Sequence, residues 1–318
     1  MKTLVSALML QFVVFALAGC CAVSMPEAKA TVKVVDEAGK PVHDADVTIY
    51  FQYNEAMKPG QGWGNNTIMN HAVGKSNADG IFEGTGVTGD DAWARAKKTG
   101  YYLSSSNPNA KLTRNTILNR WEPWPLKLEI VLKKMRNPVP MYRKSQDALK
   151  PTVFKQPVGY DLEVGDWVVP YGKGKSSDLF YTFQLQTIDE KEHYSCTITF
   201  PGQHDGLMEY KHPQDDHSWY KWPFEAPEDG YVNKFSGEAV YKVNMKSNTV
   251  KKEIKYLFRV RTKTDAEGKV ISACYGKIEG MELNWEGLWF SYWFNPDGTR
   301  NLEEDPKKNL FNQVKKAK

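Results

Sequence analysis

Short stretches in which apolar and polar residues alternate recur along most of the chain and predict β-strands. Early examples are Thr31–Val35, the positions Val47, Ile49 and Phe51, and the run Leu126–Leu132. Successive strand residues point to opposite faces of a sheet, so each stretch has one apolar face for a core. No stretch shows the spacing of a convincing amphipathic helix. The pattern therefore predicts an all-β fold.

Residues 31–135 form the first predicted domain. The dipeptide Asp79-Gly80 stands between strand-like residues and predicts a hairpin turn. The segment Asn54–Val73 is long, glycine-rich and contains Trp63, so we expect a loop there. Long loops are common places for binding sites.

Residues 136–157 contain four prolines, which disfavour a regular element and predict an extended linker. Residues 158–318 then form a second β domain. Its strand candidates are Leu179–Thr187, Tyr194–Phe200, Tyr231–Phe235, Ala239–Val243, Glu253–Thr262, Lys269–Ile278 and Leu288–Phe294. Strands at this spacing, separated by turn residues, predict a larger antiparallel β-sandwich or barrel.

Both domains resemble known families. The segments Val34–Val42, Asn77–Phe82 and Lys98–Tyr102 resemble carboxypeptidase-regulatory-like and transthyretin-like β-sandwiches. That resemblance implies an Ig-like sandwich that acts as a spacer, stabiliser or adhesion part without catalysis. The second domain resembles uncharacterised bacterial envelope proteins, a likeness that brings no activity or cofactor. Its matching segments are Gly159–Trp167, Ala226–Tyr231, Phe258–Thr262, Tyr275–Ile278 and Asn301–Phe311.

The first residues have the pattern of a secretory signal. A positive start at Lys2 precedes the uncharged, mostly apolar run Leu4–Leu17. This run of about 14 residues is shorter than the roughly 20 that a membrane-spanning helix needs.

The end of the run, Leu17-Ala18-Gly19-Cys20, resembles the lipobox of bacterial lipoproteins. The resemblance implies removal of residues 1–19 and acylation of Cys20, with residues 20–30 as a tether. The absence of aspartate after Cys20 implies the outer membrane in a cell that has two. The alternative is an ordinary secreted protein cut after Ala18 or Ala30.

Composition and charge narrow the range of partners. Aromatic residues make up 13% of the chain, with ten Trp and sixteen Tyr, which favours strands. The net charge is only +4, and lysines occur in pairs at Lys133-Lys134, Lys251-Lys252 and Lys315-Lys316. No long basic run is present, so we expect no nucleic-acid partner. The pairs are typical of solvated faces, with weak attraction to an anionic surface as the alternative.

Cys196 and Cys274 lie in strand-like runs, and export permits a disulfide between them. The alternative is two separate buried thiols, since free cysteine is among the most buried residue types. The sequence does not decide between the two.

The richest polar cluster comprises His204, Asp205, His212, the pair Asp215-Asp216 and His217. Imidazole and carboxylate are common zinc ligands, so a divalent metal site is one interpretation. The alternative is a solvated loop, because Pro213 prevents a helical presentation of His212 and His217.

Tryptophans form a second constellation, of which Trp219, Trp222, Trp289 and Trp293 are candidates for stacking on a ligand. Strand alternation puts Trp289 and Trp293 on one face, and Phe290, Tyr292 and Phe294 on the other. An exposed flat pair of tryptophans suits sugar rings, whereas core packing is the alternative.

Signals for catalysis are weak. The chain has no Gly-x-Ser-x-Gly motif, and the carboxylate pairs Asp161/Glu163 and Glu282/Glu286 are typical of charged turns. We therefore expect an exported, lipid-anchored, non-enzymatic binding or scaffold protein with a glycan or an envelope protein as its partner. The alternative is a metal-assisted hydrolase that uses His204, Asp205, His212 and His217. A purely structural envelope component is a third reading.

Overall fold

The computed structural model describes residues 25–56, 65–106, 112–150, 152–212, 217–242 and 245–314. The predicted signal segment, Cys20, Asp215, Asp216 and the Lys315-Lys316 pair lie outside these ranges. The chain divides into two compact units. The first unit comprises the chain up to Lys134 and the segment Asp215–Tyr220, and the second unit comprises the rest.

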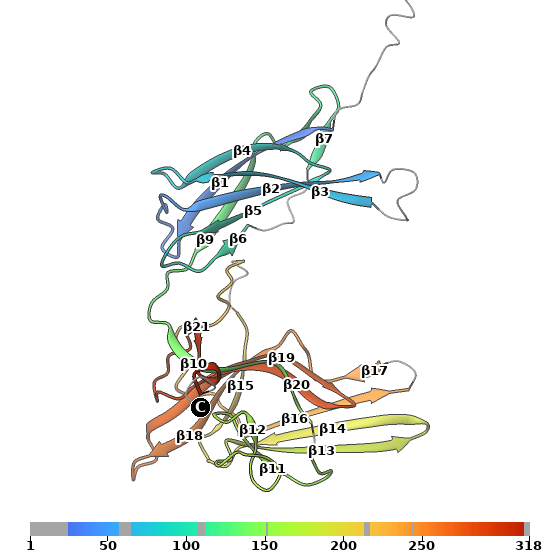
Figure 1. Ribbon diagram of the computed structural model, residues 1–318, viewed down its shortest axis with the longest axis vertical. Helices are drawn as coiled ribbons and strands as arrows, with labels where there is room; N and C mark the ends of the chain where they lie inside the picture. Colours follow the sequence, from blue (N-terminus) through green and yellow to red (C-terminus); the bar gives the residue numbers. More distant parts are fainter. Residues whose placement is uncertain are drawn as a thin grey trace, which may run out of the picture. The chain divides into compact units, whose positions relative to one another are not determined.

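The first unit is a sandwich of two β-sheets, visible as two layers in Figure 1. One sheet has the order β4-β1-β8-β7, with β9 also pairing with β1. Its strands are β1 Glu27–Asp36, β4 Ile81–Val87, β7 Thr113–Asn115, β8 Arg120–Glu122 and β9 Leu126–Leu132. The other sheet has the order β3-β2-β5-β6. Its strands are β2 Asp46–Ala56, β3 Asn65–Lys75, β5 Asp91–Lys97 and β6 Ser104–Ser105.

The core of the first unit follows the predicted alternation. Val47, Ile49 and Phe51 of β2 are fully buried, and they pack with Ile130 and Leu132 of β9. Burial of such side chains contributes roughly 1.5–3 kcal/mol each. The alternating positions that were visible in the sequence therefore form the core.

Three local predictions for the first unit are wrong. The predicted tether, residues 20–30, overlaps β1, where Ala28 and Ala30 are already buried in the core. Asp79-Gly80 does not form a hairpin, because it joins β3 to β4 and these strands belong to different sheets. The predicted loop Asn54–Val73 is largely strand, since β2 and β3 pair continuously from Asp46↔Lys75 to Ala56↔Asn65.

The first unit also contains a segment from much later in the chain. Ser218 forms a β-bridge with Ser104, and the Trp219 N–H donates to the Leu103 carbonyl at 3.0 Å. The Tyr220 ring stacks on Tyr102 with centroids 4.5 Å apart. Residues 31–135 are therefore not the whole of this unit.

The second unit is a sandwich of two six-stranded sheets, not a barrel. One sheet has the order β15-β18-β19-β20-β10-β21. Its strands are β10 Val139–Leu149, β15 Gly206–Tyr210, β18 Lys255–Thr264, β19 Val270–Asn284, β20 Gly287–Asn295 and β21 Glu304–Asn309. The other has the order β12-β11-β13-β14-β16-β17. Its strands are β11 Val158–Asp161, β12 Asp166–Trp167, β13 Leu179–Ile188, β14 Lys191–Thr199, β16 Lys234–Tyr241 and β17 Met245–Asn248.

The predicted linker 136–157 is wrong, because it contains β10, which pairs with β20 and β21. Two of its four prolines, Pro151 and Pro157, lie beyond β10, and Pro140 lies near its start, where the ladder to β20 has not yet begun. Proline is tolerated where no ladder hydrogen bond is needed. The helix α2, Leu310–Val314, follows β21. Among the described residues, no helix is long and apolar enough to cross a membrane.

Strand β20 lies between β19 and β10, in the interior of its sheet. Phe290, Tyr292 and Phe294 are buried and face the other sheet's core residues, while Trp289 and Trp293 are only half-buried. The predicted division of the aromatic side chains between two faces is confirmed. The outer face of this sheet is thereby available for a site.

Candidate functional site

The four predicted metal ligands do not converge. The Asp205 carboxylate accepts the Thr262 N–H at 3.0 Å, and the His204 carbonyl accepts Arg259 Nε at 2.7 Å, so both residues hold a turn. His212 contacts the Tyr210 hydroxyl at 3.3 Å. His217 belongs to the first unit. Within the described ranges, no three His, Cys, Asp or Glu residues are placed to hold an ion.

Cys196 and Cys274 are separate free thiols, so the structure supports the alternative to a disulfide. Cys196 lies in β14 and Cys274 in β19, strands of opposite sheets. Burial raises the pKa of the Cys196 thiol to about 12. Such a thiol stays protonated at neutral pH and is a packing residue.

The four candidate tryptophans have three different environments. Trp219 belongs to the first unit and is 66% exposed. Trp222 is buried beside Trp293, with ring centroids 6.3 Å apart, and the Lys277 ammonium lies 5.3 Å from the Trp293 ring. Trp222 is therefore a packing residue, Trp293 lies half-buried beside it, and Trp289 lines a pocket.

The Trp289 pocket is a cavity of about 480 Å³ on the outer face of the β18-β19-β20-β10 sheet. Both neighbours of β20 bulge at this place. The β10 ladder shifts register between Lys144 and Asp147, where Gln146 has a φ of 49°, and the β19 ladder shifts between Glu279 and Glu282. A bulge bends its strand and increases the local twist. One bulge on each side of β20 thus bends the neighbouring strands and leaves a hollow on this face of the sheet.

Gly280 occupies the β19 bulge with a φ of 68°, and a Cβ there would meet no atom within 4 Å. Glycine adopts this left-handed conformation without steric cost. The open space above Gly280 is part of the Trp289 pocket.

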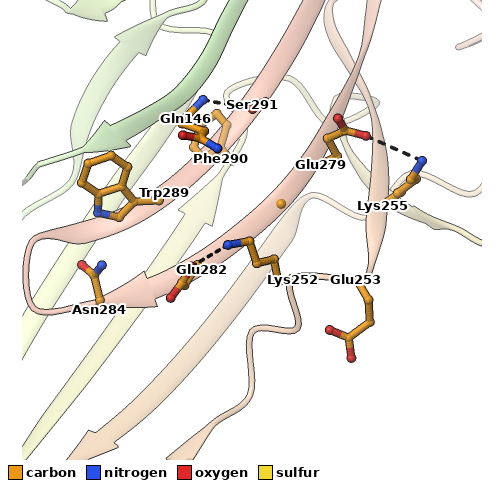
Figure 2. A pocket seen from close by; sticks show the side chains of 11 residues that line it. Gln146, Lys252, Glu253, Lys255, Glu279, Glu282, Asn284, Trp289, Phe290 and Ser291 are labelled. Atoms are coloured by element: carbon orange, nitrogen blue, oxygen red, sulfur yellow. Dashed lines mark hydrogen bonds and ion pairs between the residues drawn. The ribbon is translucent and has the colours of Figure 1, made fainter. Parts of the chain in front are cut away.

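Polar side chains surround Trp289 in this pocket, and Figure 2 shows Trp289 at one end of it and the Glu279–Lys255 pair at the other. Glu282, which is the cross-strand partner of Trp289, pairs with Lys252 at 3.2 Å. The Ser291 hydroxyl accepts the Gln146 N–H at 3.0 Å. The pocket therefore combines one aromatic wall with several hydrogen-bonding groups.

The indole Nε1 of Trp289 is buried and has no hydrogen-bond partner in the described part of the chain. The Lys150 ammonium lies 5.8 Å from the centroid of the Trp289 ring and pairs with Glu286 at 3.2 Å. Glu282 and Glu286, one of the carboxylate pairs noted in the sequence, each pair with a lysine.

A second cavity, of about 840 Å³, surrounds Arg261 in the same unit. Arg261 bonds the Asp178 carboxylate at 2.7 and 3.0 Å and Glu163 at 2.6 Å. Asp161 accepts the backbone N–H groups of Lys175 and Val164 at 2.9 and 3.1 Å. The predicted pair Asp161/Glu163 therefore stabilises a loop and a strand end.

Sequence reasoning found Trp289 but missed the other residues of its pocket. Gln146 fell within the predicted linker, and the bulges at Gln146 and Gly280 have no signal in a single sequence beyond an isolated glycine in a strand. Lys252 and Lys255 come from the turn and strand before β19, and only the fold brings them to Trp289.

Comparison with known proteins gives no family: no family model and no curated protein matches the chain. Among solved structures, a candidate carbohydrate-binding protein from Bacteroides uniformis is 8% identical, with a TM-score of 0.19 over 84% of this chain and 96% of that one. A mutant of the shaft pilin SpaA from Lactobacillus rhamnosus GG is 13% identical, with a TM-score of 0.19 over 88% and 99%. Similarity at these scores carries no functional argument.

Proposed function

We propose that the chain is a lipid-anchored binding protein of the cell envelope that binds carbohydrate in the Trp289 pocket. The observation that carries this proposal is a tryptophan at the wall of a cavity whose other lining residues are mostly polar (Figure 2). Binding sites of small ligands commonly join an aromatic wall to a few placed polar groups.

The chemistry of a sugar ring fits this combination. A pyranose presents apolar C–H groups on its faces, which pack on an indole plane, and hydroxyl groups at its edge. Glu279, Glu282 and Asn284 line the pocket and can accept or exchange hydrogen bonds with those hydroxyls.

The test is binding of the purified full-length chain to a broad glycan array, followed by calorimetric titration of the glycans that bind. Trp289→Ala should weaken binding about tenfold or more, because loss of a stacking plane removes on the order of 1.4 kcal/mol. The matched control is Trp285→Ala in the same hairpin, since Trp285 is 69% exposed and does not line the pocket.

Equal binding by wild type and Trp289→Ala, with both proteins folded, would refute the pocket as the glycan site. Equal weakening by Trp285→Ala and Trp289→Ala would also refute it. If no glycan binds with a Kd below about 100 μM, carbohydrate is excluded as the ligand class.

The lipid anchor is the second part of the proposal and rests on the Leu17-Ala18-Gly19-Cys20 sequence. Since β1 begins at Glu27, the seven residues from Cys20 can reach at most about 25 Å. Acyl chains contribute roughly 0.8 kcal/mol per buried CH₂, and more than one chain is needed for stable anchoring. Lipid on Cys20 would therefore hold the first unit close to the membrane surface.

Cys20 and Cys21 form a matched pair for testing the anchor. Cys20→Ser should abolish incorporation of labelled palmitate and move the protein out of the outer-membrane fraction, whereas Cys21→Ser should change neither. Normal labelling and fractionation of Cys20→Ser would refute the anchor and leave the secreted alternative.

A further inference from the structure

The outer face of the β3-β2-β5-β6 sheet in the first unit carries an unusual set of side chains. Because Ile49 and Ala94 point into the core, the alternating positions Tyr50, Trp93 and Arg95 face outward. These three residues are only half-buried. Aromatic residues on this face are not needed for the core, which the opposite face supplies.

These side chains form one stacked platform. The Tyr50 and Trp93 rings lie 4.1 Å apart with an interplanar angle of 14°. The Arg95 guanidinium lies 5.3 Å from the Trp93 ring and 5.6 Å from the Trp219 ring. Trp219 is 66% exposed. We call Tyr50, Trp93, Arg95 and Trp219 the Arg95 platform.

The charge of Arg95 is not neutralised within the described part of the chain. No carboxylate there forms an ion pair with it, and its Nε is buried without a hydrogen-bond acceptor. Because the guanidinium has no such partner in the described part of the chain, an incoming carboxylate can form charge-assisted hydrogen bonds with its Nη donors. Stacking on the aromatic rings fixes the plane of the guanidinium, which favours a bidentate acceptor.

The lysines and aspartates beside the platform balance one another in charge. Lys97 follows Arg95 at the next outward position of β5, and both Lys97 and Lys75 are opposite Asp46 of β2. The Lys75 ammonium forms ion pairs with Asp46 at 3.3 Å and with Asp44 at 3.1 Å. These two lysines and two aspartates offset each other, so Arg95 is the group at this edge that a negatively charged ligand would complement.

From these observations we propose that the Arg95 platform binds a polysaccharide whose sugar units carry carboxylates. The apolar face of a ring packs on Trp219, and the carboxylate of the same or the next unit pairs with Arg95. This site lies on a different unit from the Trp289 pocket, so either can fail without the other.

The experiment uses the purified full-length chain with two probes that differ only in charge: oligogalacturonate and its methyl ester. Wild type should bind the acid at least tenfold more tightly than the ester, and raising ionic strength from about 0.1 M to 1 M should narrow that difference. Trp285→Ala, at an exposed residue of the second unit outside the Trp289 pocket, serves as a control and should leave acid binding unchanged.

Three variants separate charge from stacking. Arg95→Gln should remove the preference for the acid, about tenfold or more, and Arg95→Lys should restore part of it because charge returns without the bidentate geometry. Trp219→Ala should weaken binding of the acid and binding of the ester by the same factor. The matched control is Arg114→Gln, an exposed arginine of β7 in the same unit, which should change nothing.

Several results would overturn the inference. Equal affinity for oligogalacturonate and its methyl ester would mean that Arg95 does not bind the carboxylate of the ligand. Loss of binding by Arg114→Gln as large as by Arg95→Gln would mean a diffuse charge effect. If the chain binds none of oligogalacturonate, oligoalginate and hyaluronan fragments, carboxylated polysaccharides are excluded as ligands of the Arg95 platform.

Discussion

The ion cluster around Arg261 offers a sharp test of how the second unit is stabilised. The Asp178 side chain is fully buried, and it accepts Arg261 Nε at 2.7 Å, Arg261 Nη2 at 3.0 Å and the Leu162 N–H at 2.8 Å. Arg261→Met removes the guanidinium and keeps the aliphatic stem. It also keeps a Cβ at a residue whose φ is 57°, so backbone strain is unchanged.

The magnitude follows from what the substitution leaves behind. Removing one partner of a buried ion pair costs roughly 3–5 kcal/mol, because the other charge stays buried without compensation. Arg261 is 29% exposed, so water partly screens the pair and we take the lower end, about 3 kcal/mol. We therefore expect Arg261→Met to lower the unfolding free energy of the second unit by about 3 kcal/mol.

The assay is urea denaturation fitted with separate transitions for the two units, repeated across pH. Burial raises the pKa of Asp178 above its ordinary value, against the opposing effect of Arg261. Loss of Arg261 raises it further. Because protonated Asp178 no longer buries a charge, the deficit of Arg261→Met should shrink as pH falls through that raised pKa.

The control is a double-mutant cycle with Asp178→Asn, which keeps an acceptor for the Leu162 N–H. The double variant should be more stable than Arg261→Met alone, with a coupling energy of about 2 kcal/mol. A loss below about 1 kcal/mol at every pH, or additive effects of the two substitutions, would refute the reasoning. The pair would then behave like a solvated surface ion pair.

Two further predictions concern one buried residue in each unit. Burial lowers the pKa of Lys277 from 10.5 to about 8, so between these values the unfolded chain binds more protons. The unfolding free energy of the second unit should therefore rise with pH across this window, as measured by thermal unfolding in a pH series. Lys277→Met should remove this rise. A wild-type stability that does not change with pH in this window would contradict the prediction. Tyr220 is buried on Tyr102, so Tyr220→Ala should destabilise the first unit by about 3 kcal/mol or more. A urea titration in which only the second unit's transition moved would contradict the assignment of residues 217–220 to the first unit.

Local pattern was informative where a residue's neighbours in sequence decide its environment. The alternation in β2, β9 and β20 identified core residues such as Ile49, Ile130 and Tyr292, all of which are fully buried. Pattern failed at residues 136–157, where the prolines suggested a linker. Strand β10 forms because it pairs with β20, about 140 to 150 residues away in the sequence, and local propensity does not report such a pairing.

Among the candidate site residues, the sequence identified which side chains are aromatic but not which are accessible. Trp219, Trp222, Trp289 and Trp293 were equivalent candidates. The structure has Trp222 buried under Lys255 and Lys277, and Trp219 exposed on the first unit. Tyr50 and Trp93 were missed, although their outward positions in alternating strands were a readable signal.

The sequence by itself determined the all-β class and the faces of the main strands, and its first twenty residues predict a secretory signal with a lipid on Cys20. These depend on side-chain order within a few residues, because a strand has a period of two and a signal is linear. Only the tertiary structure decided that His204 and Asp205 hold a turn, that residues 217–220 complete the first unit, and that two bulges create the Trp289 pocket. These features depend on contacts between segments distant in sequence, which pattern does not encode.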